Sequence, residues 1–305
     1  MPILVHLALI AVQVLFSSLA IAGKYVLGEV PPVVLVLARV TGAACVLLVV
    51  HRTSGAARVT DRMDLARLCG LGVLGIVANQ TFFLLGLART TAVNASVLVA
   101  TVPVFTVLNA MLIREEAPNA RKILGILAAA AGSVWLIGPG RLTLRSGTAV
   151  GDLMILAGMY AYAQYLVLGK RMLRRYDPLT VTTYVMTFAA IGVLPLGLPA
   201  LARLDLGAVA PVTWMWVAFI VLGPTLATYF LNIWALERAS SNMVAAYIYL
   251  QPLLTAAVAP LVLHGESVTT RVVVGGLGIF AGLGLVIWGE RAQRSSIPAA
   301  ALPGE

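Results

Sequence analysis

The stretch from Leu87 to Glu116, LARTTAVNASVLVATVPVFTVLNAMLIREE, returns later in the chain in altered form as LERASSNMVAAYIYLQPLLTAAVAPLVLHGE, from Leu236 to Glu266. A basic residue and a proline keep the same register in both copies, 149 residues apart: Arg89 with Arg238, and Pro103 with Pro252. Chance could supply one such match between two apolar stretches, but not an ordered series. The chain is therefore predicted to be an internal duplication.

Glycines extend the correspondence beyond these stretches. Gly125 and Gly132 recur as Gly275 and Gly282, now 150 residues apart because one residue is inserted. Gly278 and Gly282 also form a G-x-x-x-G pair, which permits close helix contact either within the subunit or at a dimer face. Each half holds five apolar runs, and an odd number makes the second half enter the membrane from the opposite side. We therefore expect an all-α membrane protein of two inverted-topology five-helix repeats, with binding at the midplane between them.

The composition excludes a soluble protein. Of 305 residues, 60% are hydrophobic and 11% are charged, and the mean hydropathy is +0.97. A soluble domain is about half apolar and about a quarter charged, so the lipid bilayer must cover much of this surface. The net charge of +9 does not indicate nucleic-acid binding, because the basic residues stand between apolar runs, where the positive-inside bias explains them.

Ten apolar runs approach the length needed to cross a bilayer core, which takes about 20 helical residues. They cover residues 4–23, 32–50, 67–88, 93–113, 119–138, 150–169, 179–200, 212–236, 242–263 and 270–289. With the N-terminus inside, the inside loops hold fourteen Lys and Arg and the outside loops six, so both termini are predicted to be cytoplasmic. The preference for Arg over Lys indicates a GC-rich bacterial genome, and hence the bacterial inner membrane.

The predicted domains follow from the repeat. Residues 1–140 form the first repeat and residues 141–290 the second. Residues 291–305 are polar, contain proline, and are predicted to be a disordered cytoplasmic tail.

Two further segments carry a family resemblance. PPVVLVLAR, from Pro31 to Arg39, and GDLMILAGMYAYAQYLVLGKRMLRRYDPLTVTTY, from Gly151 to Tyr184, resemble the second helix and the start of the second repeat in the EamA domain of the drug/metabolite transporter superfamily. The resemblance covers about residues 4–290. It implies ten helices, alternating access and transport of a small metabolite. The chain departs from symmetry at one point, because Val185 stands where Arg39 would align.

Proline lies about ten residues into the fourth and the ninth apolar run, near the midplane. A proline frees a backbone carbonyl and kinks a helix, which a membrane tolerates where protein or a water-filled cavity satisfies the backbone. A packing kink would explain either residue alone. The equivalent depth of Pro103 and Pro252 in the two halves favours a pair of hinges or cavity walls.

Polar side chains gather at similar depth and predict one cavity. In hydrocarbon, such groups usually face the bundle interior, either bonding between helices or lining a pathway. The candidate substrate-binding residues are Gln13, Arg39, Asn79, Gln80, Tyr160, Gln164, Tyr229, Asn232, Tyr247 and Gln251.

Arg39 is the charged member of this set. It lies about 10 Å from the outer end of its run at 1.5 Å per residue. Its side chain could snorkel to the outer headgroups or bond to backbone carbonyls. Alternatively, it contacts an anionic group of the substrate or forms part of a gate.

Some expected chemistry is missing from the sequence. We find no paired acid and base within the spans and no phosphate-binding loop, so an enzyme is not predicted, and neither a metal nor a cofactor is expected. No Asp or Glu stands at a midplane position, which argues against proton coupling through a central acid. The sequence predicts a secondary transporter for a small polar metabolite, such as an amino acid, working by alternating access and as an exporter. A flippase for lipids or lipid-linked metabolites is the alternative.

Overall fold

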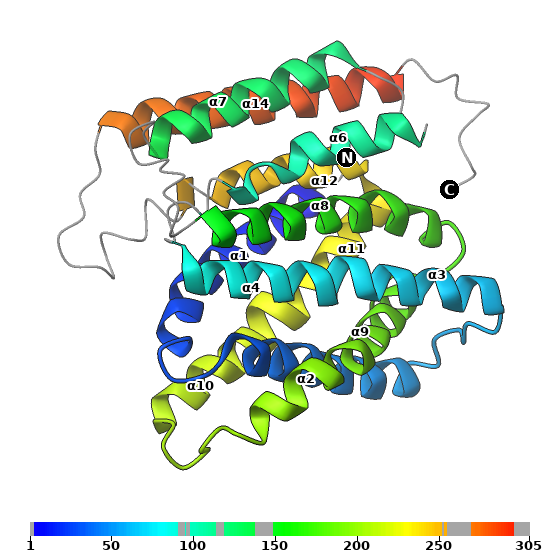
Figure 1. Ribbon diagram of the computed structural model, residues 1–305. Coiled ribbons are helices and arrows are strands. Elements are labelled where there is room, and N and C mark those ends of the chain that lie inside the picture. Colours follow the sequence, from blue (N-terminus) through cyan, green and yellow to red (C-terminus); the bar gives the residue numbers. More distant parts are fainter. Residues whose placement is uncertain are drawn as a thin grey trace.

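The computed structural model describes residues 3–90, 95, 98–113, 119–137, 149–251, 253–254 and 270–295. All elements within these ranges are helical (Figure 1). In the first half they are α1 (Ile3–Val26), α2 (Pro32–Thr53), α3 (Arg62–Gly72), η1 (Val73–Ala78), α4 (Asn79–Arg89), α6 (Val102–Leu112) and α7 (Ala120–Ile137). In the second half they are α8 (Ala149–Met172), α9 (Pro178–Leu201), α10 (Pro211–Ile220), η3 (Val221–Ala227), α11 (Thr228–Arg238), α12 (Ser241–Ala246), η4 (Tyr247–Tyr249) and α14 (Thr270–Ser295).

Within the described residues, each of the ten predicted apolar runs contains one helix or consecutive helices; the fourth run (93–113) and the ninth (242–263) are described only in part. Among the described residues, five uninterrupted helical stretches are long and apolar enough to cross a membrane: Pro32–Thr53, Arg62–Arg89, Ala149–Met172, Pro178–Leu201 and Pro211–Arg238. Shorter apolar helices lie in the first, fourth and tenth runs. The last helix continues to Ser295, into the segment predicted to be a disordered tail. Residues 296–305 of that tail lie outside the described part.

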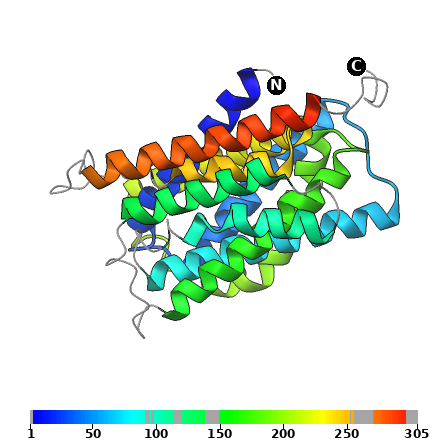
Figure 2. The ribbon, with the colours of Figure 1, turned by 90° about the horizontal axis from the view of Figure 1, so that it is seen from above.

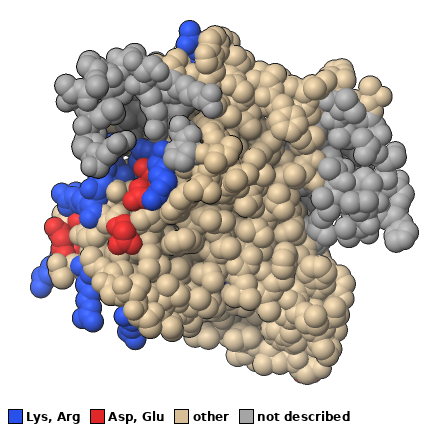
Figure 3. All heavy atoms as spheres, turned by 180° about the vertical axis from the view of Figure 1, so that it is seen from behind, with Lys and Arg blue, Asp and Glu red and all other residues tan. Residues whose placement is uncertain are grey.

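The surface of the bundle suits a bilayer. Large apolar side chains are exposed along the helices, among them Leu124, Leu153, Ile191 and Leu277. In the view of Figure 3, the Lys, Arg, Asp and Glu atoms gather mostly at one end, and most of the remaining described surface is uncharged. The charged end includes the start of α3 and the turn between α8 and α9.

Glycines bring α7 and α14 together along one side of the bundle (Figures 1 and 2). A Cβ added to Gly125 would lie 2.6 Å from the carbonyl oxygen of Gly282, and one added to Gly132 would lie 2.9 Å from that of Gly275. Gly275 and Gly282 are the repeat equivalents of Gly125 and Gly132. A two-fold rotation that exchanges the repeats therefore converts the contact of Gly125 with Gly282 into the contact of Gly275 with Gly132. The predicted close contact at Gly278 and Gly282 therefore occurs within the subunit.

Wide π-helical turns interrupt the third and eighth spans at equivalent places. The first, η1, begins at Val73, and the second, η3, begins at Val221. Pro224 inside η3 lacks a backbone N–H. In η1, Gly75 lies so close to the Tyr165 ring that an added Cβ would be 2.3 Å from its Cγ. Such turns often mark functional sites in helices.

The prediction that Pro103 kinks the middle of a continuous helix is wrong in detail. The chain makes a turn at Ala100 and Thr101, and α6 then begins at Val102 with Pro103 in its first turn. A proline is tolerated there because its missing N–H would have no partner within the helix. The span is thus broken rather than bent. Pro252 lies outside the described residues, but its span also changes character, from α12 to the 3₁₀ turn η4.

Candidate functional site: a polar cavity between the repeats

A small cavity lies among helices of both halves, where the sequence predicted a binding site. Its volume is about 60 Å³. Apolar and aromatic side chains, including Phe16 and Phe83, form much of the wall. The polar side chains in the lining are Arg39, Asn79, Gln80, Tyr162, Tyr229 and Gln251.

Arg39 reaches this cavity from α2 and is only 1% exposed, so its side chain does not snorkel to the headgroups. Its Nε donates to Oγ1 of Thr225 in the wide turn η3 at 2.8 Å, and that hydroxyl donates to the carbonyl of Ile220, the last residue of α10, at 2.8 Å. Among the described residues no carboxylate pairs with the guanidinium. A buried cation without a counter-charge is costly, and it is free to pair with an anionic group that enters the cavity.

Gln80 and Tyr229 meet across the repeats, 149 residues apart. This separation equals the spacing of the repeat, so Gln80 and Tyr229 occupy equivalent positions in the two halves. Because equivalent positions contact each other here, the pseudo-two-fold axis that relates the repeats passes between them. Gln80 Nε2 donates to the Tyr229 hydroxyl at 3.1 Å, and that hydroxyl donates to the Gly75 carbonyl at 3.4 Å. Gln80 Oε1 is buried and accepts no hydrogen bond from the residues that the structure describes. Such an acceptor beside a cavity suits an N–H donor of a ligand.

Other predicted site residues join helices around the cavity. Gln251 Nε2 donates to Gln13 Oε1 at 2.7 Å, which links α1 to the chain just after η4. Asn79 donates to the Gly158 carbonyl of α8 at 3.0 Å. Asn232 Nδ2 donates to the Tyr162 hydroxyl at 2.6 Å. Gln13 and Asn232 are buried just behind the lining residues.

The comparisons with known proteins identify the family. A model of the EamA-like transporter family matches the chain twice, over residues 3–138 and 149–288. The chain belongs to the EamA-like transporter family. It is 34% identical over 219 residues to an uncharacterized transporter of Archaeoglobus fulgidus, covering 70% of this chain and 73% of the relative. It is also 29% identical over 257 residues to a WAT1-related protein of Arabidopsis thaliana, covering 75% and 66%.

The fold of this EamA protein is also found in a crystal structure. That structure has a TM-score of 0.76 at 19% identity, covering 96% of this chain and 99% of the other. The family and the transporter relatives make the chain a multi-pass membrane transporter with a two-repeat helical fold, as the two segments in α2 and α8 indicated.

Besides Gln13 and Asn232, which lie behind the lining, three more predicted site residues of the EamA protein do not line the cavity: Tyr160, Gln164 and Tyr247. Tyr160 is 47% exposed, packs edge-on against Phe105, and accepts a hydrogen bond from Gln164 at 2.9 Å. Tyr247 is buried but bonds to His6 Nδ1 at 2.5 Å. These side chains were grouped by depth, and depth alone does not tell which face of a helix points inward.

Tyr162 was missed for the same reason. It follows Tyr160 by two residues and therefore lies about 200° around the helix, on the opposite face. It is 6% exposed and stacks on Tyr165, with ring centroids 5.8 Å apart. Gly158 lies four residues before Tyr162 and Gly151 eleven residues before it, so all three share one face of α8. Because both glycines pack against α4, their positions in the sequence indicate that this face points inward.

Proposed function

We propose that this EamA protein is a secondary transporter for small zwitterionic metabolites of the amino-acid type. The observation that supports this proposal most directly is that one cavity contains both a positive charge and a free hydrogen-bond acceptor. Within the described part of the chain, Arg39 is a buried cation without a counter-charge, and Gln80 Oε1 is a buried acceptor without a donor. A carboxylate on the first and an ammonium group on the second would satisfy both.

The cavity size bears on the mechanism. Pockets for small molecules typically measure about 300–1,000 Å³, whereas this cavity measures about 60 Å³ and has room for only a few water molecules. The structure then represents a conformation in which the cavity is closed around a volume too small for substrate. Substrate could enter only after the two repeats move apart. The break before α6 and the turn η4 are proposed as the places where the two halves bend, because interrupted helices there lie beside the cavity.

The proposed setting follows from the loop charges. The loops at the end with the α8–α9 turn are rich in basic residues, which under the positive-inside bias supports a cytoplasmic location for that end and for both termini. In a bacterial inner membrane, export is the proposed direction.

Flux into proteoliposomes tests this proposal. Purified protein is reconstituted and given labelled amino acids, nucleosides and sugars, with and without an imposed pH gradient. We expect saturable amino-acid flux that is independent of the gradient, because no carboxylate lines the described cavity. Flux that follows the gradient would show proton coupling, and flux of sugars or nucleosides alone would refute the substrate class. Folded protein without flux for any solute would favour the lipid-flipping alternative.

A further inference from the structure

Thr225 holds the Arg39 side chain in the wall of the polar cavity. Its Oγ1 accepts from Arg39 Nε at 2.8 Å, and the two residues are 0% and 1% exposed. A hydroxyl has a single proton to donate, and Thr225 donates it to the Ile220 carbonyl. The hydroxyl can therefore only accept from the guanidinium. The position of this oxygen fixes where Nε lies.

The close approach of α2 to η3 makes this bond possible. Gly42 lies three residues after Arg39 and so on the same side of α2. A Cβ added to Gly42 would be 2.8 Å from Cγ1 of Val221, the first residue of η3. Nε is the guanidinium nitrogen nearest to the backbone, so an acceptor must come from a helix at short range. The wide turn supplies that acceptor at Thr225.

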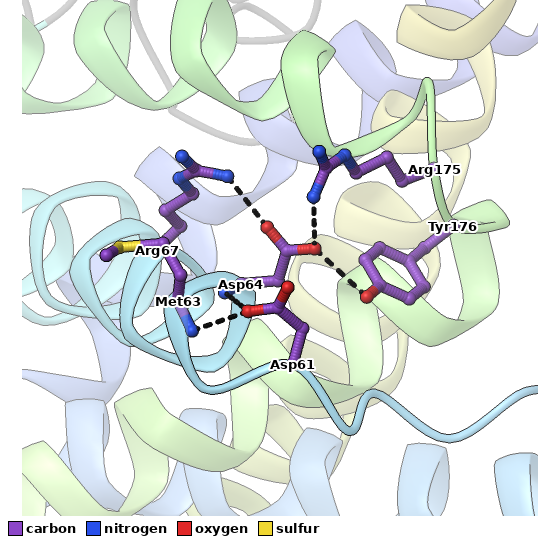
Figure 4. Close-up of polar contacts among 6 residues, drawn as sticks. All are labelled: Asp61, Met63, Asp64, Arg67, Arg175 and Tyr176. Atoms are coloured by element: carbon purple, nitrogen blue, oxygen red, sulfur yellow. Dashed lines mark hydrogen bonds and ion pairs between the residues drawn. The ribbon is translucent and has the colours of Figure 1, made fainter.

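The acceptor that holds Arg39 is neutral. At the charged end of the bundle, by contrast, Arg67 and Arg175 each donate to the carboxylate of Asp64 at 2.8 Å (Figure 4). A carboxylate neutralises the cation that it holds, whereas a hydroxyl positions the cation and leaves its charge in place. Thr225 can therefore orient Arg39 without competing with an anionic substrate.

The same bond determines which donors of Arg39 remain. A guanidinium has five N–H groups in a planar fork, one on Nε and two on each Nη. The described residues offer Arg39 no hydrogen bond besides the one from Nε. An incoming carboxylate is left with Nη1 and Nη2, and two parallel N–H bonds match its two oxygens.

The pair of Thr225 and Arg39 occurs in one half of the chain. The spacing of 149 residues that relates the third and eighth spans aligns Thr225 with Ile76. Val185 stands where Arg39 would align. Both counterparts are apolar and fully buried. The hydroxyl and the guanidinium are thus present together in one half and replaced together in the other, as expected for two residues that act as a unit.

We propose that Thr225 is a positioning residue for the substrate, because it holds the Arg39 guanidinium with Nη1 and Nη2 left to receive a carboxylate end-on. This inference rests on the proposed function, since it requires a substrate that carries a carboxylate. Without the hydroxyl, the long side chain could adopt several rotamers, and the substrate would have to order it on binding. The loss of Thr225 should therefore weaken affinity rather than block the transport cycle.

Amino-acid flux into proteoliposomes, measured over a range of substrate concentrations, tests this inference. Thr225→Val removes the hydroxyl at nearly constant shape. It should raise KM roughly fivefold, which corresponds to ordering one long side chain on binding, and leave the maximal flux nearly unchanged. Thr225→Ala, a second variant without the hydroxyl, should behave alike. Thr225→Ser keeps the hydroxyl and should retain the KM of the unaltered protein.

A double variant separates positioning from a purely structural role. If the hydroxyl acts through the guanidinium, adding Thr225→Val to Arg39→Gln should cause no further loss of flux. Thr213→Val is the matched control in the same span. Thr213 is fully buried and its hydroxyl bonds to no described residue, so its loss should leave KM unchanged.

Three results would each overturn the inference while leaving the proposed function intact. They are an unchanged KM in Thr225→Val and Thr225→Ala, an equal rise of KM in Thr213→Val, and a further loss of flux in the double variant. A different result separates the two proposals. If the unaltered protein carries no amino acid, or if Arg39→Gln transports normally, the proposed function fails and this inference fails with it.

Discussion

Replacing Arg39 with glutamine is expected to reduce substrate flux by about a hundredfold while the protein still folds. Truncating one partner of a buried charged pair costs roughly 2–5 kcal/mol, and a carboxylate substrate would lose the one cationic partner that the described residues place in the cavity lining. Folding should survive, because the guanidinium is itself a buried charge that no described carboxylate neutralises. Flux in proteoliposomes and the unfolding temperature of the same preparation measure the two effects.

Two further variants complete the Arg39 test. Arg39→Lys keeps the charge and should retain more flux than Arg39→Gln, although it loses the planar fork of donors. Arg203→Gln, in the exposed turn after α9, should transport normally. If Arg39→Gln transports like the unaltered protein, Arg39 has no part in binding.

Replacing Gly282 with leucine is expected to destabilise the fold by about 1–3 kcal/mol, as overpacking does in a close-packed interior. The added Cβ would lie 2.5 Å from both the Gly125 carbonyl oxygen and the Ala129 backbone nitrogen. Backbone atoms cannot rotate away, so α7 and α14 must separate. A lower unfolding temperature in detergent measures the effect.

Gly284 offers the matched control on the same helix. A Cβ added to Gly284 would meet no atom within 4 Å, so Gly284→Leu should leave the unfolding temperature unchanged. An equal loss in both variants would mean that leucine in α14 is harmful for another reason. No loss in Gly282→Leu would refute the close α7–α14 contact.

The repeat was visible in the sequence because it depends on residues with special backbone demands. Glycines at close helix contacts and prolines at helix breaks are hard to replace, so their spacing of 149 or 150 residues persists while the apolar residues vary. The contact between Gln80 and Tyr229 follows the same spacing. Hydropathy alone predicted the ten apolar runs.

The finer features of the site could not be predicted from the sequence. In the wide turns η1 and η3, backbone N–H groups bond to the carbonyl five residues earlier in place of the one four residues earlier. The pattern of apolar residues does not predict where this change occurs. The inward face of α8 is set by its packing on α4, so Tyr162 lines the cavity and Tyr160 does not. Among the described residues Arg39 has no carboxylate beside it, and this depends on how helices far apart in the sequence pack together.

The most direct test of the central proposal is competition for flux among three unlabelled compounds that share one side chain. They are an amino acid, the amine that lacks its carboxylate, and the acid that lacks its ammonium group. Because the proposed site uses Arg39 for one charge and Gln80 Oε1 for the other, only the amino acid should compete strongly with a labelled amino acid. Equal competition by the amine or by the acid would contradict recognition of a zwitterion in this cavity.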